Sequence, residues 1–119
     1  DFLNPVIELD GDSYTFDTGA DETILYLPYY TKLKKELDAK YQVQNLLLTG
    51  VGGSEHKKGM IIDFETTINE LKVRADSVQL FTENIKAGGE YYFGNIGQDI
   101  TSQYDTMILN FKNMFILFR

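Results

Sequence analysis

The sequence predicts a mainly β, barrel-like domain with a single amphipathic helix. Many short runs alternate apolar and polar residues, and Gly, Asn, Asp and Ser separate these runs, as is typical of strands joined by tight turns. One segment alone has apolar residues at clear helical spacing, and there is no internal repeat. The length is that of one domain, and we expect residues 1–119 to form a single lobe.

The first elements that we expect are a β-hairpin at residues 6–16 and a helix at residues 29–40. The hairpin turn is indicated by Asp10-Gly11-Asp12-Ser13. Pro28 suits the first turn of a helix. Apolar residues with helical spacing follow it: Tyr30, Leu33, Leu37 and Tyr41.

The second half of the chain is expected to be built from strands. Residues 43–51 form one of them and lead into the glycine-rich segment GVGGSEHKKG, which predicts a solvent-facing hairpin tip. The return strand has one apolar face: Met60, Ile62, Phe64, Thr66 and Ile68. Short strands at 71–73 and 77–81, an aromatic strand before GNIG, a short helix around 98–103 and a closing hairpin at 106–118 complete the prediction.

The composition disfavours several classes of function. Eighteen acidic residues against eleven basic ones leave a net charge of −7, and we expect no nucleic-acid partner because a negative surface repels phosphate. No apolar run approaches the length of a membrane span. With no cysteine, the chain forms neither disulfides nor thiolate metal sites.

Metal ligands are sparse in the sequence. His56 is the single histidine, and we expect it to be exposed because it has no Cys, His or clustered-acid partner. Asp10, Asp12 and Ser13 have a passing similarity to a calcium loop but lack its glycine and its distant glutamate, so a hairpin turn is the better interpretation. We therefore expect no metal ion and no other cofactor.

The segment FDTGADETIL, residues 16–25, carries the strongest chemical signal. Asp17 follows an apolar residue, and a carboxylate among apolar neighbours is costly unless it is paired or protonated. Two carboxyl groups that meet can share a proton, and the pair then offers both a general base and a general acid. Thr18 supplies a hydroxyl for hydrogen bonding across an interface, and Gly19 leaves room for a partner to approach.

Four features, in chain order, resemble the retropepsin-like aspartic proteases. FDTGADETIL matches their active-site loop, and LTGVGGSEHKKGMI is similar to their flap, a glycine-rich hairpin that closes over substrate. GNIGQDI resembles their second hallmark, a strand that threads past the active-site loop and precedes a short helix. The hairpin ending in MFILF occupies the place of their terminal strands. The resemblance implies a closed β-barrel lobe with one amphipathic helix, a flap hairpin and a short C-terminal helix.

The resemblance also implies roles for individual residues. Asp17 would be the catalytic carboxylate, Thr18 would hydrogen-bond to its counterpart in a partner lobe, and Gly19 would bring backbone close to the substrate. The positions expected to contact substrate lie in the active-site loop and the flap: Ala20, Asp21, Val51, Gly52 and Gly53.

Two positions place the chain closer to the bacterial members of this family. Retroviral members have an Arg at the position of Gln98 that pairs with the acid at the position of Asp21, and this chain lacks that ion pair. Asp99 stands where retroviral members often have Asn, and the long helix at 29–40 also fits the bacterial type. The chain begins with Asp1 rather than Met, as a processed product or a piece of a longer polypeptide would. The compartment is left open, and export to the periplasm or the medium is compatible with these features.

One Asp-Thr-Gly supplies half of the implied site. The implied reaction, hydrolysis of a peptide bond by an aspartic endopeptidase, needs two carboxylates that share one proton and activate a water. Asp76 lacks the following glycine and falls in an expected strand, so we reject it as the second carboxylate. The second carboxylate is therefore expected from another copy of this chain or from another lobe of a longer polypeptide.

Two alternatives to an aspartic endopeptidase stay open at this point. The first is a non-catalytic peptide-binding or assembly module on the same fold, because a fold does not determine a function. The second is a β domain unrelated to proteases that binds small ligands or glycans. The intact Asp-Thr-Gly-Ala favours catalysis over both, since a lobe without activity has no chemical need for it.

Overall fold

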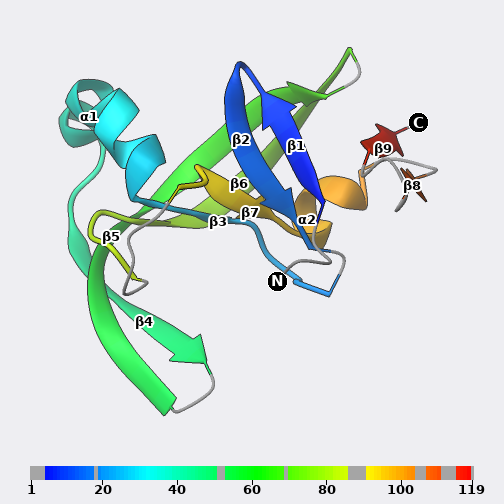
Figure 1. Ribbon diagram of the computed structural model, residues 1–119. Helices are drawn as coiled ribbons and strands as arrows, with labels where there is room; N and C mark the ends of the chain where they lie inside the picture. Colours follow the sequence, from blue (N-terminus) through cyan, green and yellow to red (C-terminus); the bar gives the residue numbers. More distant parts are fainter. Residues whose placement is uncertain are drawn as a thin grey trace.

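The structure is a computed structural model that describes residues 5–17, 19–50, 53–68, 70–85, 91–103, 107–110 and 115–118. It is mainly β, as predicted (Figure 1). Its two helices are α1 at Leu27–Lys40 and α2 at Gln98–Thr101.

The strands of the main sheet are, in chain order, β1 Val6–Leu9, β2 Asp12–Phe16, β3 Ile24–Leu25, β4 Gln44–Gly50, β5 Gly53–Ile68, β6 Leu71–Phe81 and β7 Gly94–Ile96. Their spatial order is β1-β2-β7-β3-β6-β5-β4, and the sheet is mixed because β7 runs parallel to β2 and β3 runs parallel to β6. A separate antiparallel hairpin joins β8 Met107–Asn110 to β9 Phe115–Phe118, as expected for the end of the chain.

The main sheet is open. Its edges are β1 and β4, and these two strands do not pair with each other in the part of the chain that the structure describes. The predicted closure into a barrel is therefore not confirmed. The terminal strand β9 contacts β1, which brings the C-terminal hairpin to one edge of the sheet.

The β1–β2 hairpin confirms its sequence prediction. Leu9 is paired with Asp12, so the turn consists of Asp10 and Gly11 alone. Both residues have positive φ, 53° and 86° respectively, as a two-residue hairpin turn of type I′ requires. Asp and Gly are residue types that adopt this conformation at low cost, which explains why the turn forms here.

Helix α1 also forms where its pattern predicts it, beginning two residues earlier than the expected range. Pro28 lies in its first turn, where the missing amide proton costs nothing. Leu37 is buried, and Tyr29, Tyr30 and Leu33 pack against the core as partly buried side chains. The helical geometry is interrupted at Leu33, where φ is −112° and ψ is 20°.

The core is supplied mainly by β5 and β6 together with β2, β3 and β7. The alternation predicted for β5 is confirmed, because one face of the strand is buried and the other is exposed. The buried side chains of that face are those of Met60, Ile62, Phe64, Thr66 and Ile68. They pack with Phe16, Leu25, Leu80, Ile96 and Ile100, each at most 1% exposed.

Three local predictions are corrected. The segments at 71–73 and 77–81 belong to one strand, β6, which continues through a bulge where Ser77 has φ of 61°. The strands β4 and β5 pair up to Gly50 and Gly53, so Ser54 to Lys58 extend β5 rather than form a hairpin tip. The aromatic residues before GNIG are not a strand, because β7 begins at Gly94.

His56 lies in β5 opposite Leu47 and is exposed, as predicted. Of the helices that the structure describes, none combines the length and apolar character that crossing a membrane requires. Residues 86–89, the segment Lys-Ala-Gly-Gly, lie outside the described residues.

Candidate active site

The candidate site is built on the loop between β2 and β3, residues 17–23. These two strands are not neighbours, because β7 lies between them. Phe16 pairs with Ile96 in the parallel β2–β7 ladder, and Ile24 pairs with Asn95 in the antiparallel β7–β3 ladder. The loop therefore passes around the end of β7, and residues from distant parts of the sequence meet there.

Asp17 is held by the loop in two ways. Its backbone amide donates to the carbonyl oxygen of Ile96 at 3.0 Å. Its Oδ1 accepts from the backbone amide of Gly19 at 2.9 Å. A Cβ at position 19 would lie 3.3 Å from that same Oδ1, a tight contact, so glycine suits this position. The carboxyl group is thus oriented by its own loop and remains partly exposed.

The start of α2 fixes the far side of the loop. The amides of Gln98 and Asp99 donate to the carbonyl oxygens of Ala20 at 2.8 Å and Asp21 at 3.1 Å. A Cβ on Gly97 would lie 2.7 Å from backbone atoms of Glu22, so only glycine permits this approach. Backbone-to-backbone contact of this kind holds residues 20–22 against the start of α2.

The loop is also fixed by a side-chain network that the sequence analysis did not predict. Asp99 accepts from the backbone amide of Thr23 at 2.9 Å and from its hydroxyl at 2.6 Å. The same hydroxyl oxygen accepts from the amide of Gly97 at 3.0 Å. Thr23 is only 1% exposed, so this network stands in a water-poor setting, where such bonds are strong. In the sequence, the only signals of this network are a threonine before the short apolar segment at 24–25 and an acid just after GNIG. They become informative only when the order of the strands in the sheet is known.

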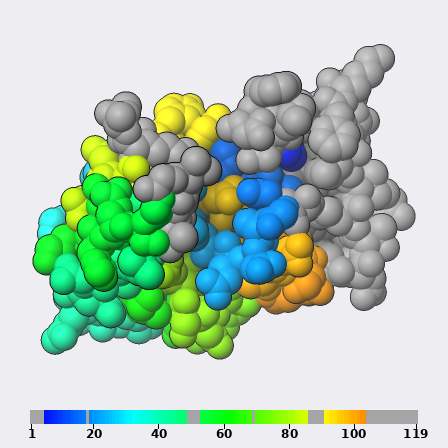
Figure 2. Space-filling model, turned by 90° about the horizontal axis from the view of Figure 1, so that it is seen from below, coloured from blue at the N-terminus to red at the C-terminus, as the bar shows by residue number. Residues whose placement is uncertain are grey.

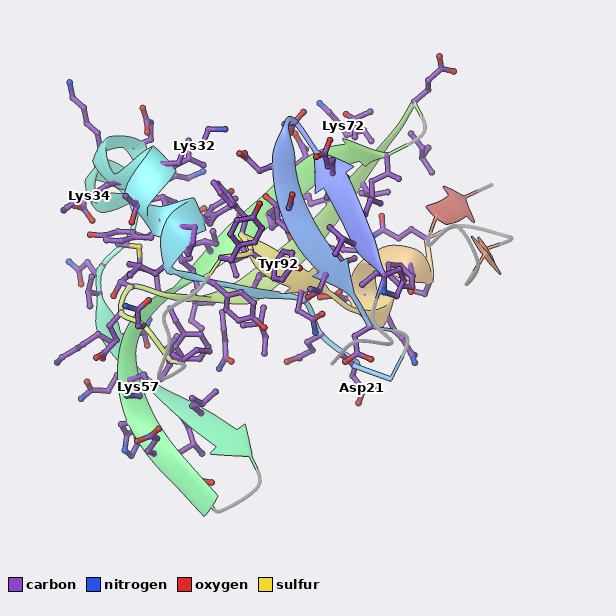
Figure 3. The ribbon with its side chains drawn as sticks, viewed as in Figure 1. Asp21, Lys32, Lys34, Lys57, Lys72 and Tyr92 are labelled. Carbon is purple, nitrogen blue, oxygen red and sulfur yellow. The ribbon has the colours of Figure 1, made fainter. Side chains whose placement is uncertain are left out.

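The structure brings several predicted site residues together. Asp17, Gly19, Ala20 and Asp21 lie in one loop, and Asp21 is exposed at its outer turn (Figure 3). Gly53 lies at the end of the β4–β5 hairpin with φ of 118°. Thr18, Val51 and Gly52 lie outside the described residues.

The loop and the hairpin reach the same face of the molecule. Seen from below, Asp17 and residues 19–23 in blue lie beside α2 in orange, and the β4–β5 hairpin in green lies across from them (Figure 2).

Asp76, which the sequence analysis rejects as the second carboxylate, lies away from the candidate loop in the sequence and in another strand. That residue lies in β6, where its carboxylate accepts from Arg74 Nε at 2.7 Å. Among the residues that the structure describes, no group of three or more His, Cys, Asp or Glu side chains is arranged to hold a metal ion.

No protein-family model matches the chain, and no characterised protein matches it in sequence. Inferences about function therefore depend on the loop, its anchoring and its surroundings.

Proposed function

We propose that this chain is one lobe of a retropepsin-like aspartic endopeptidase, in which Asp17 supplies one of two catalytic carboxylates. The observation that carries the proposal is the position of Asp17 and Gly19 directly after the paired ends of the parallel strands β2 and β7, with Asp17 hydrogen-bonded to Ile96 and Gly19. Catalytic groups work best when their supporting shell orients them beforehand.

The chemistry follows from two carboxyl groups that share a proton. The ionised member accepts a proton from a water, which attacks the carbonyl carbon of the peptide bond. The protonated member donates a hydrogen bond to the carbonyl oxygen. A proton of the pair is then transferred to the amide nitrogen, so that the C–N bond breaks and the amine leaves. The pKa values of such a pair belong to both groups together. The second carboxylate would come from a second copy of the chain or from another lobe.

In this proposal Thr23 and Asp99 are positioning residues. They act on the loop through three hydrogen bonds and have no role at the reacting atoms. Ala20 and Asp21 follow the catalytic residues in the same loop, and their carbonyl oxygens are held by the amides at the start of α2. Substrate contacts in this part of the site would therefore involve a backbone that does not have to rearrange.

The β4–β5 hairpin would be the flap. It ends in the paired glycines Gly50 and Gly53, and it lies on the face that the loop also reaches (Figure 2). A lid of this kind covers substrate and can limit turnover. The barrel closure expected of such a lobe, and the pairing of its terminal hairpin with a second lobe, belong to the proposal. The contact of β9 with the edge strand β1 places the terminal hairpin beside the main sheet.

The test is a cleavage assay on a mixture of unstructured peptides over a range of protein concentrations, with molar mass measured by light scattering. We expect cleavage that requires the dimeric or two-lobed form, and we expect Asp17→Asn to abolish it without unfolding the protein. Asp76→Asn is the matched control, because it removes an exposed carboxylate outside the loop and should leave the rate unchanged. Equal rates for Asp17→Asn and the parent protein would refute the proposal.

A second candidate is a non-catalytic peptide-binding module on the same fold. It is favoured by one observation: β4 is an edge strand, and Val43 and Leu47 beside and within it are 47% and 52% exposed. An extended peptide can add to such an edge through backbone hydrogen bonds. This candidate predicts saturable peptide binding with no cleavage by any assembled form of the protein.

A further inference from the structure

A cavity of about 220 Å³ lies at the opposite end of β2 from Asp17. Its walls come from the β1–β2 hairpin, from α1, from β5 and from Phe93. Asp12, at the start of β2, lines it, and Asp17 follows the end of the same strand. The two residues are about 16 Å apart, given a rise of roughly 3.3 Å per residue in a strand. The cavity is therefore separate from the proposed catalytic loop.

Aromatic rings form a continuous wall of this cavity. The centroid of the Tyr14 ring is 6.2 Å from that of Phe64 and 6.1 Å from that of Phe93. Tyr29 continues the wall, with its ring centroid 5.9 Å from that of Phe64. Faces of aromatic rings carry negative electrostatic potential, so a cation that reaches the face of one of these rings is attracted to it.

A cation of the protein already lies at this site. Lys32 Nζ is 2.6 Å from Asp12 Oδ2 and 5.6 Å from the centroid of the Phe93 ring. Its side chain is 50% exposed, so it can move into solvent without unfolding α1. Lys32 lies on the side of the helix nearer β2, whereas Lys34 lies on another side (Figure 3). The position of Lys32 shows that an ammonium group at the edge of the cavity can contact both Asp12 and the ring of Phe93.

Negative charge exceeds positive charge around the cavity. Three carboxylates line it, those of Asp10, Asp12 and Glu65, against the single ammonium of Lys32. Glu65 also lies 3.4 Å from the exposed ammonium of Lys72. A second hollow of about 200 Å³ continues from Asp12 and Phe93 to Gly11, Ser13 and Tyr91, and it adds no cation.

The field of these carboxylates reaches the cavity wall. Burial raises the pKa of Tyr14, and the nearby Tyr29, Asp12 and Asp10 raise it further. Burial likewise raises the pKa of Tyr29, with smaller contributions from Tyr41 and Asp10. Both phenols therefore stay neutral near pH 7, and the wall presents hydroxyl groups rather than phenolates.

Thr66 leaves a hydrogen-bonding group without a partner at this cavity. It lines the cavity and is only 6% exposed, and its Oγ1 has no hydrogen-bond partner among the residues that the structure describes. A buried polar atom without a partner costs free energy, and native proteins rarely leave one so. A hydroxyl both donates and accepts hydrogen bonds, so a polar ligand group in the cavity, an N–H donor among them, would supply the missing bond.

We propose that this cavity binds a small ligand through a primary ammonium group, which displaces Lys32 from Asp12. The aromatic wall and the carboxylates favour a cation, and the unpartnered Thr66 hydroxyl offers an acceptor to a cation that has N–H groups. The volume is below the roughly 300–1,000 Å³ of sites for drug-sized ligands, so a short alkylammonium or a single side chain fits. The ammonium can come from a free amine or from a lysine of a peptide.

The first experiment titrates the whole chain with butylammonium and, in parallel, with 1-butanol, its neutral counterpart. Amide and aromatic-ring NMR signals of Tyr14, Phe64 and Phe93 report binding in the cavity. We expect saturable shifts of these signals with butylammonium and at least tenfold weaker binding of butanol. Equal binding of the two compounds would overturn the proposal, and so would shifts confined to the exposed ring of Tyr91.

Matched variants then test the role of the displaced lysine. Lys32→Met should tighten butylammonium binding several-fold, because it removes the competing ammonium. Lys34→Met is the control: Lys34 lies on the same helix, also 2.6 Å from an aspartate and 5.3 Å from an aromatic ring, but it does not line the cavity. Asp12→Asn should weaken binding about tenfold. An unchanged affinity in both Lys32→Met and Asp12→Asn would refute the proposed site.

A capped lysine, with its amino and carboxyl groups blocked as amides, separates the two sources of the ammonium. Tighter binding of capped lysine than of butylammonium identifies a peptide side chain as the ligand. Affinity equal to or weaker than that of butylammonium identifies a free amine. Either result supports a primary ammonium site, whereas no saturation by any of the ammonium probes overturns it.

Discussion

The carboxylate of Asp99 accepts two hydrogen bonds from Thr23, at 2.9 Å from the amide nitrogen and 2.6 Å from the hydroxyl oxygen. The two residues are 76 positions apart in the chain. Their contact joins the end of the Asp17 loop to the start of α2.

Thr23→Val should lower the free energy of unfolding by about 2 kcal/mol, because it removes a buried hydrogen bond to a charged group and the acceptor for the amide of Gly97. Chemical denaturation measures the loss. Thr15→Val is the control, because the Thr15 hydroxyl donates at 2.7 Å to the neutral, partly buried Asn95. That variant should lose about 1 kcal/mol. A smaller loss for Thr23→Val than for Thr15→Val would contradict the proposed anchoring role.

Gly97→Ala should destabilise the protein by about 1–3 kcal/mol, because its Cβ would meet backbone atoms of Glu22 at 2.7 Å, and backbone cannot move aside as a side chain can. Thermal unfolding measures the effect. The comparison is Gly11→Asn, where open space surrounds the Cβ position and Asn tolerates the positive φ, with an expected loss below about 1 kcal/mol. Equal melting temperatures of the two variants would show that the close approach at Gly97 does not destabilise the alanine variant.

Ser77→Gly should raise the stability of the protein by about 1 kcal/mol, because Ser77 has φ of 61° and a side chain with Cβ is strained in this region. Ser13→Gly is the matched control in β2, where the backbone is extended and glycine should cost about 0.5–1 kcal/mol. Differential scanning calorimetry on both variants distinguishes the two outcomes. A lower melting temperature for Ser77→Gly would show that the serine stabilises the bulge in another way.

Stability should fall as the pH rises above about 10. Burial raises the pKa of Tyr14 in the folded state, so above the unfolded value of about 10 the unfolded chain loses a proton that the folded chain keeps. The contribution of Tyr14 to the free energy of unfolding is thus fully present below pH 10. It is lost as the pH rises through the pKa of Tyr14 in the folded state. Unfolding free energies between pH 9 and pH 11 should decline less steeply in Tyr14→Phe than in the parent protein.

The control for this pH dependence is Tyr91→Phe, because Tyr91 is 78% exposed. That variant should decline with pH as the parent protein does. A decline of equal steepness in Tyr14→Phe would mean that other groups dominate the alkaline loss of stability.

Much of the fold is predictable from the sequence because the signals are local. The positive φ values at Asp10 and Gly11 match residue types that tolerate them, and the buried face of β5 follows from its alternation. The predicted break between strands at 71–73 and 77–81 is wrong. A bulge at Ser77 lets one strand continue through polar residues that resemble a loop in the sequence. The extent of the β4–β5 hairpin was underestimated because its ladder of backbone hydrogen bonds does not require apolar side chains.

The sequence by itself determined the chemical groups of the candidate site, Asp17 and Gly19 in one turn after a strand. Their residue types and their spacing belong to one short segment of the chain. Only the tertiary structure decided that β7 lies between β2 and β3, and hence that Asp99 and Gly97 hold this turn. It also brought Lys32, Asp12 and Phe93 to one cavity. Contacts between such distant segments depend on the packing of the whole core around Phe16 and Ile96, which no local pattern encodes.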